Sequence, residues 1–252
     1  MVFSMVKRVA ITLCGVLLVG GAAKADRVAS VSYERDSEFS DIRELLIDEG
    51  VFDDGVQFIN ELFTLERDIK IVVGAEDGPL YDPSISEIQI PYWFYTEIID
   101  RYSQIDNQAD AQAQFASDAM LHTLFHELGH ALTDQLEIPI VGKEEDAVDG
   151  LASVLLLEYY DDGAEMARNA AELFALEGED RGELTDADFW GEHSLDEQRY
   201  FSTLCHVYGS DPAKYEGLAD EMEFSDDRRD LCEETYLRLV ADWNTLLDDA
   251  LQ

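Results

Sequence analysis

The sequence predicts an α+β fold that is mostly helical and has a small β-sheet in its N-terminal half. Two short segments, residues 68–73 and 87–90, combine β-branched apolar residues with alternating polar ones, which is typical of strands. Most of the remaining chain repeats its apolar residues near the helical period of 3.6. Hydrophobic residues make up 46% of the 252 residues, which excludes a disordered chain and is enough to fill one substantial core.

Glycine and proline residues separate the elements and allow them to be placed in chain order. Residues 26–38 are polar and are expected to form a loose lead-in, and residues 74–83 and 177–191 are expected to be loops. Helices are predicted over residues 39–49, 53–65, 92–102, 144–160, 164–176, 195–208 and 228–251, with one more that begins between residues 110 and 118 and ends before Pro139. No repeat or linker divides the chain, so we expect one domain over residues 26–252.

The first 25 residues have the three parts of a secretory signal peptide. Lys7 and Arg8 precede an apolar run over residues 9–22, and Ala23-Lys24-Ala25 fits a cleavage site of the small-x-small type. We therefore expect residues 1–25 to be removed and the protein to be periplasmic or secreted. An uncleaved anchor is the alternative, and it is disfavoured because the apolar run is short for a membrane span.

The chain is strongly acidic, with 17 basic and 56 acidic residues and a formal charge of −39. Such a charge repels nucleic acid and anionic membranes, so we expect neither as a partner. No later run is long and apolar enough to cross a bilayer, which argues against stable membrane association after signal cleavage. Adaptation of the protein surface to high salt is the favoured explanation of this charge. The alternatives are a solvated acidic surface with no special role and a preference for cationic substrates.

Cys205 and Cys232 are the cysteines that remain once the expected signal peptide is removed. An even pair in an exported protein predicts a disulfide, because the compartments outside the cytosol favour oxidation. Two buried free thiols are the alternative. By the loop-entropy model the bridge would stabilise the fold by about 3 to 4 kcal/mol.

The strongest functional signal in the chain is the motif His126-Glu127-Leu128-Gly129-His130. Residues four apart lie one turn apart on the same face of a helix, so His126 and His130 can hold one metal ion. Two histidines so spaced, with a glutamate after the first, are typical of a zinc hydrolase site. We predict one Zn²⁺ ion, with Glu127 as the general base that takes a proton from the activated water. A chance match on an ordinary helix is the alternative.

A catalytic zinc needs a third protein ligand. His122 lies four residues before His126 in the same stripe, but we expect it to pack behind the site rather than to bind the ion. The acidic start of the next helix is favoured instead, with Glu145 as the ligand and Asp149 as the acceptor that orients a ligand histidine. Glu144 and Asp149 are the less favoured candidates for the third ligand, and no role is expected for Glu144 if Glu145 binds. An acidic helix start that complements the helix dipole, without any metal, is the alternative.

These residues resemble two groups of metallopeptidases. The HELGH motif followed by Glu145-x-x-x-Asp149 is similar to the arrangement in thermolysin-like glutamate-zincins, with a shorter gap between the two parts. A closer resemblance is to a family of exported bacterial proteins, once filed as a domain of unknown function and regarded as metallopeptidases. FHELGHAL at residues 125–132, PIVGKEEDAVD at 139–149 and EHSLDEQRY at 192–200 carry it. The resemblance covers most of the chain and implies a zincin-like fold and peptide or protein substrates.

A peptidase also needs a group that stabilises the oxyanion of the tetrahedral intermediate. The candidates are His193, Arg199 and Tyr200, and we favour His193 as a catalytic residue because it lies in a polar loop before a helix. Arg199 is expected to pair with a local acid such as Asp196. His206 lies on the helix that carries a cysteine and is expected to be structural.

Together these features predict an exported zinc-dependent metallopeptidase. The segment 87–90 is expected to be an edge strand that binds substrate by strand addition. Two other classes of protein fit the same sequence. One is a zinc-bound, non-catalytic interaction module of the periplasm, and the other is an acidic exported protein with an accidental motif.

Overall fold

The computed structural model describes residues 28–252, and the expected signal peptide, residues 1–25, lies outside the described residues. Within the described range the fold is α+β and mostly helical, with a four-stranded sheet near its N-terminal end, which confirms the predicted fold class. No helix of the described part is both long enough and apolar enough to span a membrane.

The sheet has the strand order β1-β2-β4-β3. The strands are β1, Ala29–Tyr33; β2, Ile69–Val73; β3, Leu80–Asp82; and β4, Glu87–Ile90. Strand β2 pairs in parallel with β1 and with β4, whereas β3 pairs antiparallel with β4. Strand β4 therefore has partners on both sides, and the expectation that it is an edge strand is wrong. In the described sheet that edge belongs to β3.

Two of these strands were not predicted. Residues 26–38 were expected to be a loose lead-in, but they contain β1, whose first backbone N–H groups are held by Asn60. The amide of Ala29 donates to Asn60 Oδ1 at 2.9 Å, and that of Val28 does so at 2.7 Å. Strand β3 lies inside the expected loop 74–83. Strand β3 has only three residues, and β1 is defined by its pairing with β2, about forty residues later, a property that local composition does not reveal.

Ten ranges of the described chain are helical. They are α1, Ser40–Glu49; α2, Val51–Leu62; α3, Tyr92–Tyr102; α4, Ala109–Gln135; α5, Glu144–Tyr159; α6, Gly163–Asp180; α7, Asp186–Phe189; α8, Asp196–Ser210; α9, Glu216–Glu221; and α10, Asp226–Leu246. The expected loop 177–191 is therefore wrong in part, because α6 extends into it and α7 lies within it. Helix α9 was not predicted.

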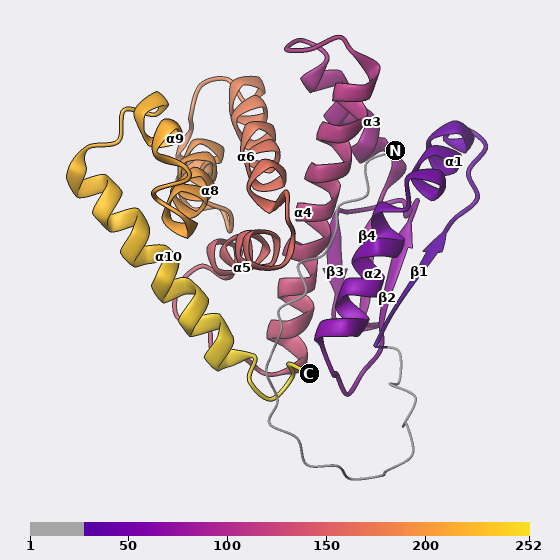
Figure 1. Cartoon of the computed structure of the whole chain (residues 1–252). Coiled ribbons are helices and arrows are strands. Elements are labelled where there is room, and N and C mark those ends of the chain that lie inside the picture. The colour runs from indigo at the N-terminus through magenta and orange to yellow at the C-terminus, as the bar shows by residue number, and fades with distance from the viewer. Residues whose placement is uncertain (1–27) are drawn as a thin grey trace.

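Helix α4 is the central element of the molecule. In Figure 1 it runs through the middle, with the sheet and α1 to α3 on one side and α5 to α10 on the other. It contacts β3, β4, α2 and α3 as well as α5 and α6, so its two sides are covered by different parts of the chain. Leu124, Phe125, Leu128 and Leu132 are fully buried in these contacts. The helix ends where Glu137 adopts a positive φ of 51°, two residues before Pro139.

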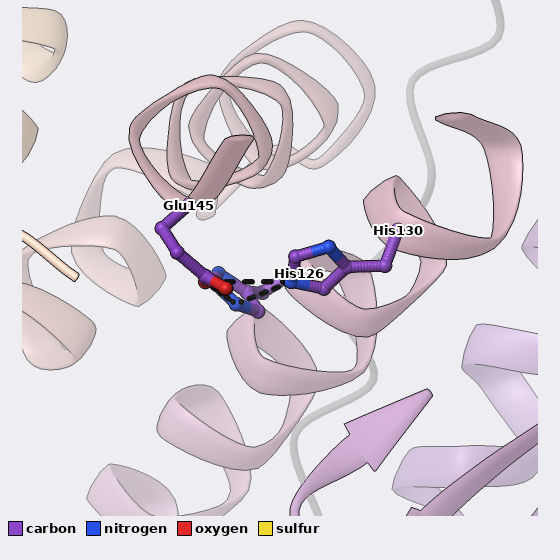
Figure 2. Close-up of side chains that lie close together, drawn as sticks. All are labelled: His126, His130 and Glu145. Atoms are coloured by element: carbon purple, nitrogen blue, oxygen red, sulfur yellow. Dashed lines mark hydrogen bonds and ion pairs between the residues drawn. The ribbon is translucent and has the colours of Figure 1, made fainter. Parts of the chain in front are cut away.

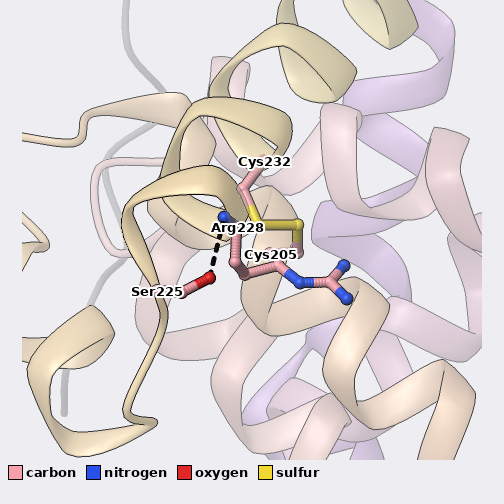
Figure 3. Close-up of a disulfide and its surroundings, with 4 residues drawn as sticks. All are labelled: Cys205, Ser225, Arg228 and Cys232. Atoms are coloured by element: carbon pink, nitrogen blue, oxygen red, sulfur yellow. Dashed lines mark hydrogen bonds between the residues drawn. A yellow bond between two sulfur atoms is a disulfide. The ribbon is translucent and has the colours of Figure 1, made fainter.

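A disulfide between Cys205 and Cys232 joins α8 to α10, with the two Cα atoms 5.0 Å apart (Figure 3). The helices approach closely because residue 209, one turn further along α8, is glycine. A side chain at Gly209 would collide with the carbonyl oxygen of Cys232. Ser225 caps α10 by accepting a hydrogen bond from the Arg228 amide at 3.2 Å. Helix α10 is therefore fastened near its N-terminal end.

Candidate metal centre

Helices α4 and α5 touch at the HELGH motif, and a glycine makes the contact possible. A Cβ atom on Gly129 would lie only 2.7 Å from Cβ of Val148, nearer than real Cβ contacts allow. The helical penalty of glycine, about 1 kcal/mol relative to alanine, is thus offset by close packing of the two helices. Because Glu145 and Asp149 lie on either side of Val148 on α5, this contact brings both carboxylates to the histidines of α4.

His126, His130 and Glu145 form a compact cluster, drawn in Figure 2. The two Nε2 atoms lie 3.3 Å apart. Glu145 Oε2 lies 3.2 Å from Nε2 of His126 and 3.4 Å from Nε2 of His130. A tetrahedral zinc ion with bonds of about 2.0 to 2.1 Å would have ligand atoms about 3.3 to 3.4 Å apart. The three atoms therefore have the spacing of three corners of such a tetrahedron.

The other nitrogen of each histidine is held by a carboxylate. His126 Nδ1 lies 2.7 Å from Oδ1 of Asp149, and His130 Nδ1 lies 2.8 Å from Oε1 of Glu144. In a neutral imidazole each Nδ1 then donates its proton, and Nε2 carries the lone pair. Two lone pairs and a carboxylate oxygen consequently face one another, an arrangement that needs a cation between them.

Glu145 Oε2 supplies a second sign that the residues fit a metal ion. It is a buried atom without a hydrogen bond to any described residue, although three imidazoles surround it. A buried carboxylate oxygen left without a hydrogen bond is costly, and a metal ion removes that cost. The donor set of two imidazoles and one carboxylate is also one that zinc prefers.

The electrostatics of the cluster favour positive charge at the same place. Burial lowers the pKa of His126, but the carboxylates of Asp149 and Glu145 beside its ring nitrogens outweigh burial and raise that pKa to about 9. Burial raises the pKa of Glu145, but the neighbouring imidazoles outweigh it and hold that pKa well below its usual range. Without a metal ion, a proton on the imidazoles therefore supplies the positive charge that the carboxylates require.

Glu127 lies beside the cluster, with only 6% of its surface exposed. Burial raises the pKa of its carboxyl group above the usual range, although His126 and His130 partly oppose the shift. A carboxylate in this setting binds a proton more readily than one in water. That property suits a group that accepts a proton during a reaction and then releases it.

His193 approaches the cluster from the segment between α7 and α8. Its Nε2 lies 2.9 Å from Glu145 Oε2, and its ring stacks beside that of His126 with 6.1 Å between the ring centres. The segment is anchored by Lys143, whose Nζ donates to the His193 carbonyl oxygen at 2.9 Å. About half of the His193 side chain is exposed. It can therefore face both the cluster and an approaching ligand.

Comparison with known proteins agrees with this geometry. Residues 32–247 match the model of a family described as "Putative metallopeptidase". The chain belongs to this family. The match spans α4, α5 and the His193 segment, and it confirms the resemblance drawn from the motifs. No curated protein and no solved structure matches the chain.

In this member of the family, the other candidate residues lie outside the cluster. His122 is buried edge-on against Phe174, in the packing position expected for it, and burial lowers its pKa to about 3. His206 is buried beside Tyr236. The hydroxyl of Tyr200 contacts the sulfur of Met222 at 3.7 Å, a contact away from the three clustered residues.

The expected partner of Arg199 is wrong. Asp196 pairs instead with Arg181, at 2.8 Å, whereas Arg199 binds Asp149. Sequence reasoning therefore missed the contact between Arg199 and the acceptor of His126. It also gave Glu144 no role, although this residue contacts His130. Glu144 could have been identified from its position next to Glu145. Adjacent side chains in the first turn of a helix can contact the same neighbouring helix at two different points along its axis. No local signal links Arg199 to a residue fifty positions earlier.

Proposed function

We propose that this family member is an exported zinc-dependent peptidase that hydrolyses peptide bonds. The observation that carries the proposal is the spacing of 3.2 to 3.4 Å among Nε2 of His126, Nε2 of His130 and Oε2 of Glu145. This spacing suits a tetrahedral zinc ion that uses three protein atoms and keeps its fourth position for water or substrate. One Zn²⁺ ion would thus be held by the three residues chosen from the sequence.

The bound ion would supply the Lewis acidity that makes water nucleophilic at neutral pH and polarises the scissile carbonyl. The protein residues would do the rest. Glu127 would accept a proton from the attacking water at its carboxylate and deliver it to the leaving amine. Asp149 and Glu144 would hold the two histidines in the tautomer that presents Nε2.

His193 would act on the substrate side of the site. Its Nε2 faces Glu145, and its half-exposed ring can donate a hydrogen bond to the oxyanion that forms at the attacked carbonyl. The anchor between Lys143 and the His193 carbonyl would hold the segment at a fixed distance from the ligand residues. Export is supported by the signal-like segment before Asp26 and by the disulfide between α8 and α10.

Metal analysis combined with one isosteric variant tests the proposal. The purified protein should contain one zinc ion per chain and should cleave members of a peptide library, read by mass spectrometry. Glu127→Gln should keep the zinc and lose cleavage by a factor of at least 100, the lower range for a general base. Glu137→Gln, an exposed change just beyond the same helix, is the matched control and should keep full activity.

The same experiment separates the alternative functions. A zinc-containing protein that cleaves nothing, with or without the substitution, would indicate a non-catalytic interaction module that uses the metal as a structural part. A protein that retains no zinc after dialysis into zinc-buffered solution would refute the metal site itself. Full activity in Glu127→Gln would remove this residue from the mechanism.

A further inference from the structure

Arg199 lies on α8 behind the metal centre and binds Asp149 at two points. Its Nε lies 2.7 Å from Oδ2, and its Nη2 lies 2.9 Å from Oδ1. Both side chains are almost completely enclosed, with 13% of the arginine and 12% of the aspartate exposed. Two parallel hydrogen bonds from a planar guanidinium fix the plane of a carboxylate, which a single contact cannot do.

One of the two carboxylate oxygens is shared with the metal centre. Oδ1 of Asp149 accepts from Arg199 and also lies 2.7 Å from Nδ1 of His126. The plane that the guanidinium imposes therefore decides where this oxygen lies. The oxygen in turn decides how the imidazole of His126 is rotated, and so where its Nε2 points.

Arg199 is itself held from its other side. The central carbon of its guanidinium lies 3.9 Å from the centre of the Phe174 ring on α6. Arginine stacks on an aromatic face in this way, and a lysine ammonium would reach the same place as a point charge without the planar fork. An unbroken series of contacts thus runs from α6 through Arg199 and Asp149 to His126.

We propose that Arg199 is a positioning residue of the metal centre, which fixes the carboxylate of Asp149 and through it the metal-binding orientation of His126. The proposal rests on the proposed function only in taking His126 as a metal ligand. Arg199 does not contact the clustered ligand atoms, so its effect passes through the carboxylate. It is not available as an oxyanion-stabilising group, because its guanidinium is turned to Asp149 and Phe174.

Arg199→Lys tests this inference through metal binding rather than activity. Zinc affinity is measured by competition with a chelator of known affinity, and Co²⁺ absorption reports the ligand geometry. The variant should bind zinc about 10- to 100-fold more weakly, the range for loss of a group that orients a ligand, and should show an altered Co²⁺ spectrum. The matched control is Arg181→Lys. Arg181 pairs with Asp196 and Glu197 of α8, at 2.8 and 2.6 Å. Its substitution should leave the zinc affinity and the Co²⁺ spectrum unchanged.

A second variant covers the case in which Arg199→Lys does not fold. Arg199→Gln, which shortens the side chain and removes the two-point contact while leaving Asp149 in place, should show the same weakened zinc binding. Wild-type affinity in either folded variant would overturn the inference, because a purely structural arginine would change the melting temperature alone. Failure of the wild-type protein to bind zinc would refute the proposed function instead, so the two failures are distinguishable.

Discussion

Gly129→Ala perturbs the assembly of the metal centre without touching a ligand. The new Cβ would lie 2.7 Å from Val148 Cβ, 2.8 Å from its Cγ1 and 3.3 Å from its Cα. Carbon atoms normally rest about 3.5 to 4.0 Å apart. Two of the three opposing atoms belong to the stem and backbone of Val148, so a change of rotamer cannot relieve the contact. Helix α5 would have to move away from α4 by roughly 1 Å.

Gly129→Ala has two opposing effects on the stability of the fold. Overpacking a close contact costs about 1 to 3 kcal/mol, while alanine in place of glycine favours the helix by about 1 kcal/mol. The net loss should be about 0 to 2 kcal/mol. Metal binding should suffer far more, because Glu145 moves with α5 and ligand sites tolerate displacements of only about 0.5 Å. A misplacement of about 1 Å can reduce the function of a site by about 100-fold, and we expect zinc affinity to fall by that order.

Two measurements separate these effects. Chelator competition gives the zinc affinity, and urea unfolding of the metal-free protein gives the stability. Gly217→Ala is the matched control, because Gly217 is also helical and a Cβ atom added there would have nothing within 4 Å. That control should gain up to about 1 kcal/mol of stability and keep its zinc affinity. Wild-type zinc affinity in Gly129→Ala would refute the idea that close helix packing places Glu145.

Three further predictions concern other residues. The loss of zinc affinity should be largest for Glu145→Ala and about 10- to 100-fold for Asp149→Ala. It should be smaller for Glu144→Ala, because the Glu144 side chain is 45% exposed. Chelator competition ranks the three variants, and wild-type affinity in Glu145→Ala would show that another residue is the third ligand. Burial raises the pKa of Asp118 to about 6, so its ionisation destabilises the fold as pH rises from about 4 to 6. Relative to wild type, metal-free Asp118→Asn should therefore gain about 2 kcal/mol between pH 4 and pH 7 in urea unfolding, and a flat difference would contradict this. Intact mass of exported protein should show a chain that begins at Asp26, and retention of residues 1–25 would exclude cleavage.

The parts of the site that lie on one helix could be predicted from the sequence, because helical spacing is a local rule. His126 and His130 share a face whatever the rest of the fold does. The same rule relates Glu145 to Asp149 on the next helix. The need for a third ligand suggested that the next helix supplies it, although only the structure shows that Gly129 sets the distance between the two helices.

The failed predictions for β1 and for Arg199 depend on contacts between distant segments. Strand β1 has a weak local signal and is defined by its parallel partner β2, about forty residues later. The expectation for segment 87–90 was wrong because β3, only three residues long, covers it as a further strand. Arg199 has acidic neighbours three and two residues before it, and the nearby charges suggested a local pair. Burial against Phe174 instead directs it to Asp149.

The placement of the proposed ligands on α4 and α5 would couple the release of a bound ion to motions of the core. These helices contact each other directly, and α4 also contacts the sheet, so the ligand atoms cannot separate by the movement of a surface loop alone. A ligand that binds only the folded state stabilises it by mass action, and for this protein that state is the packed pair of helices. Release of zinc should therefore be slower than from a centre held by mobile loops. A chelator should lower the unfolding temperature, whereas a centre built on mobile loops would lose its ion and leave the fold largely unchanged.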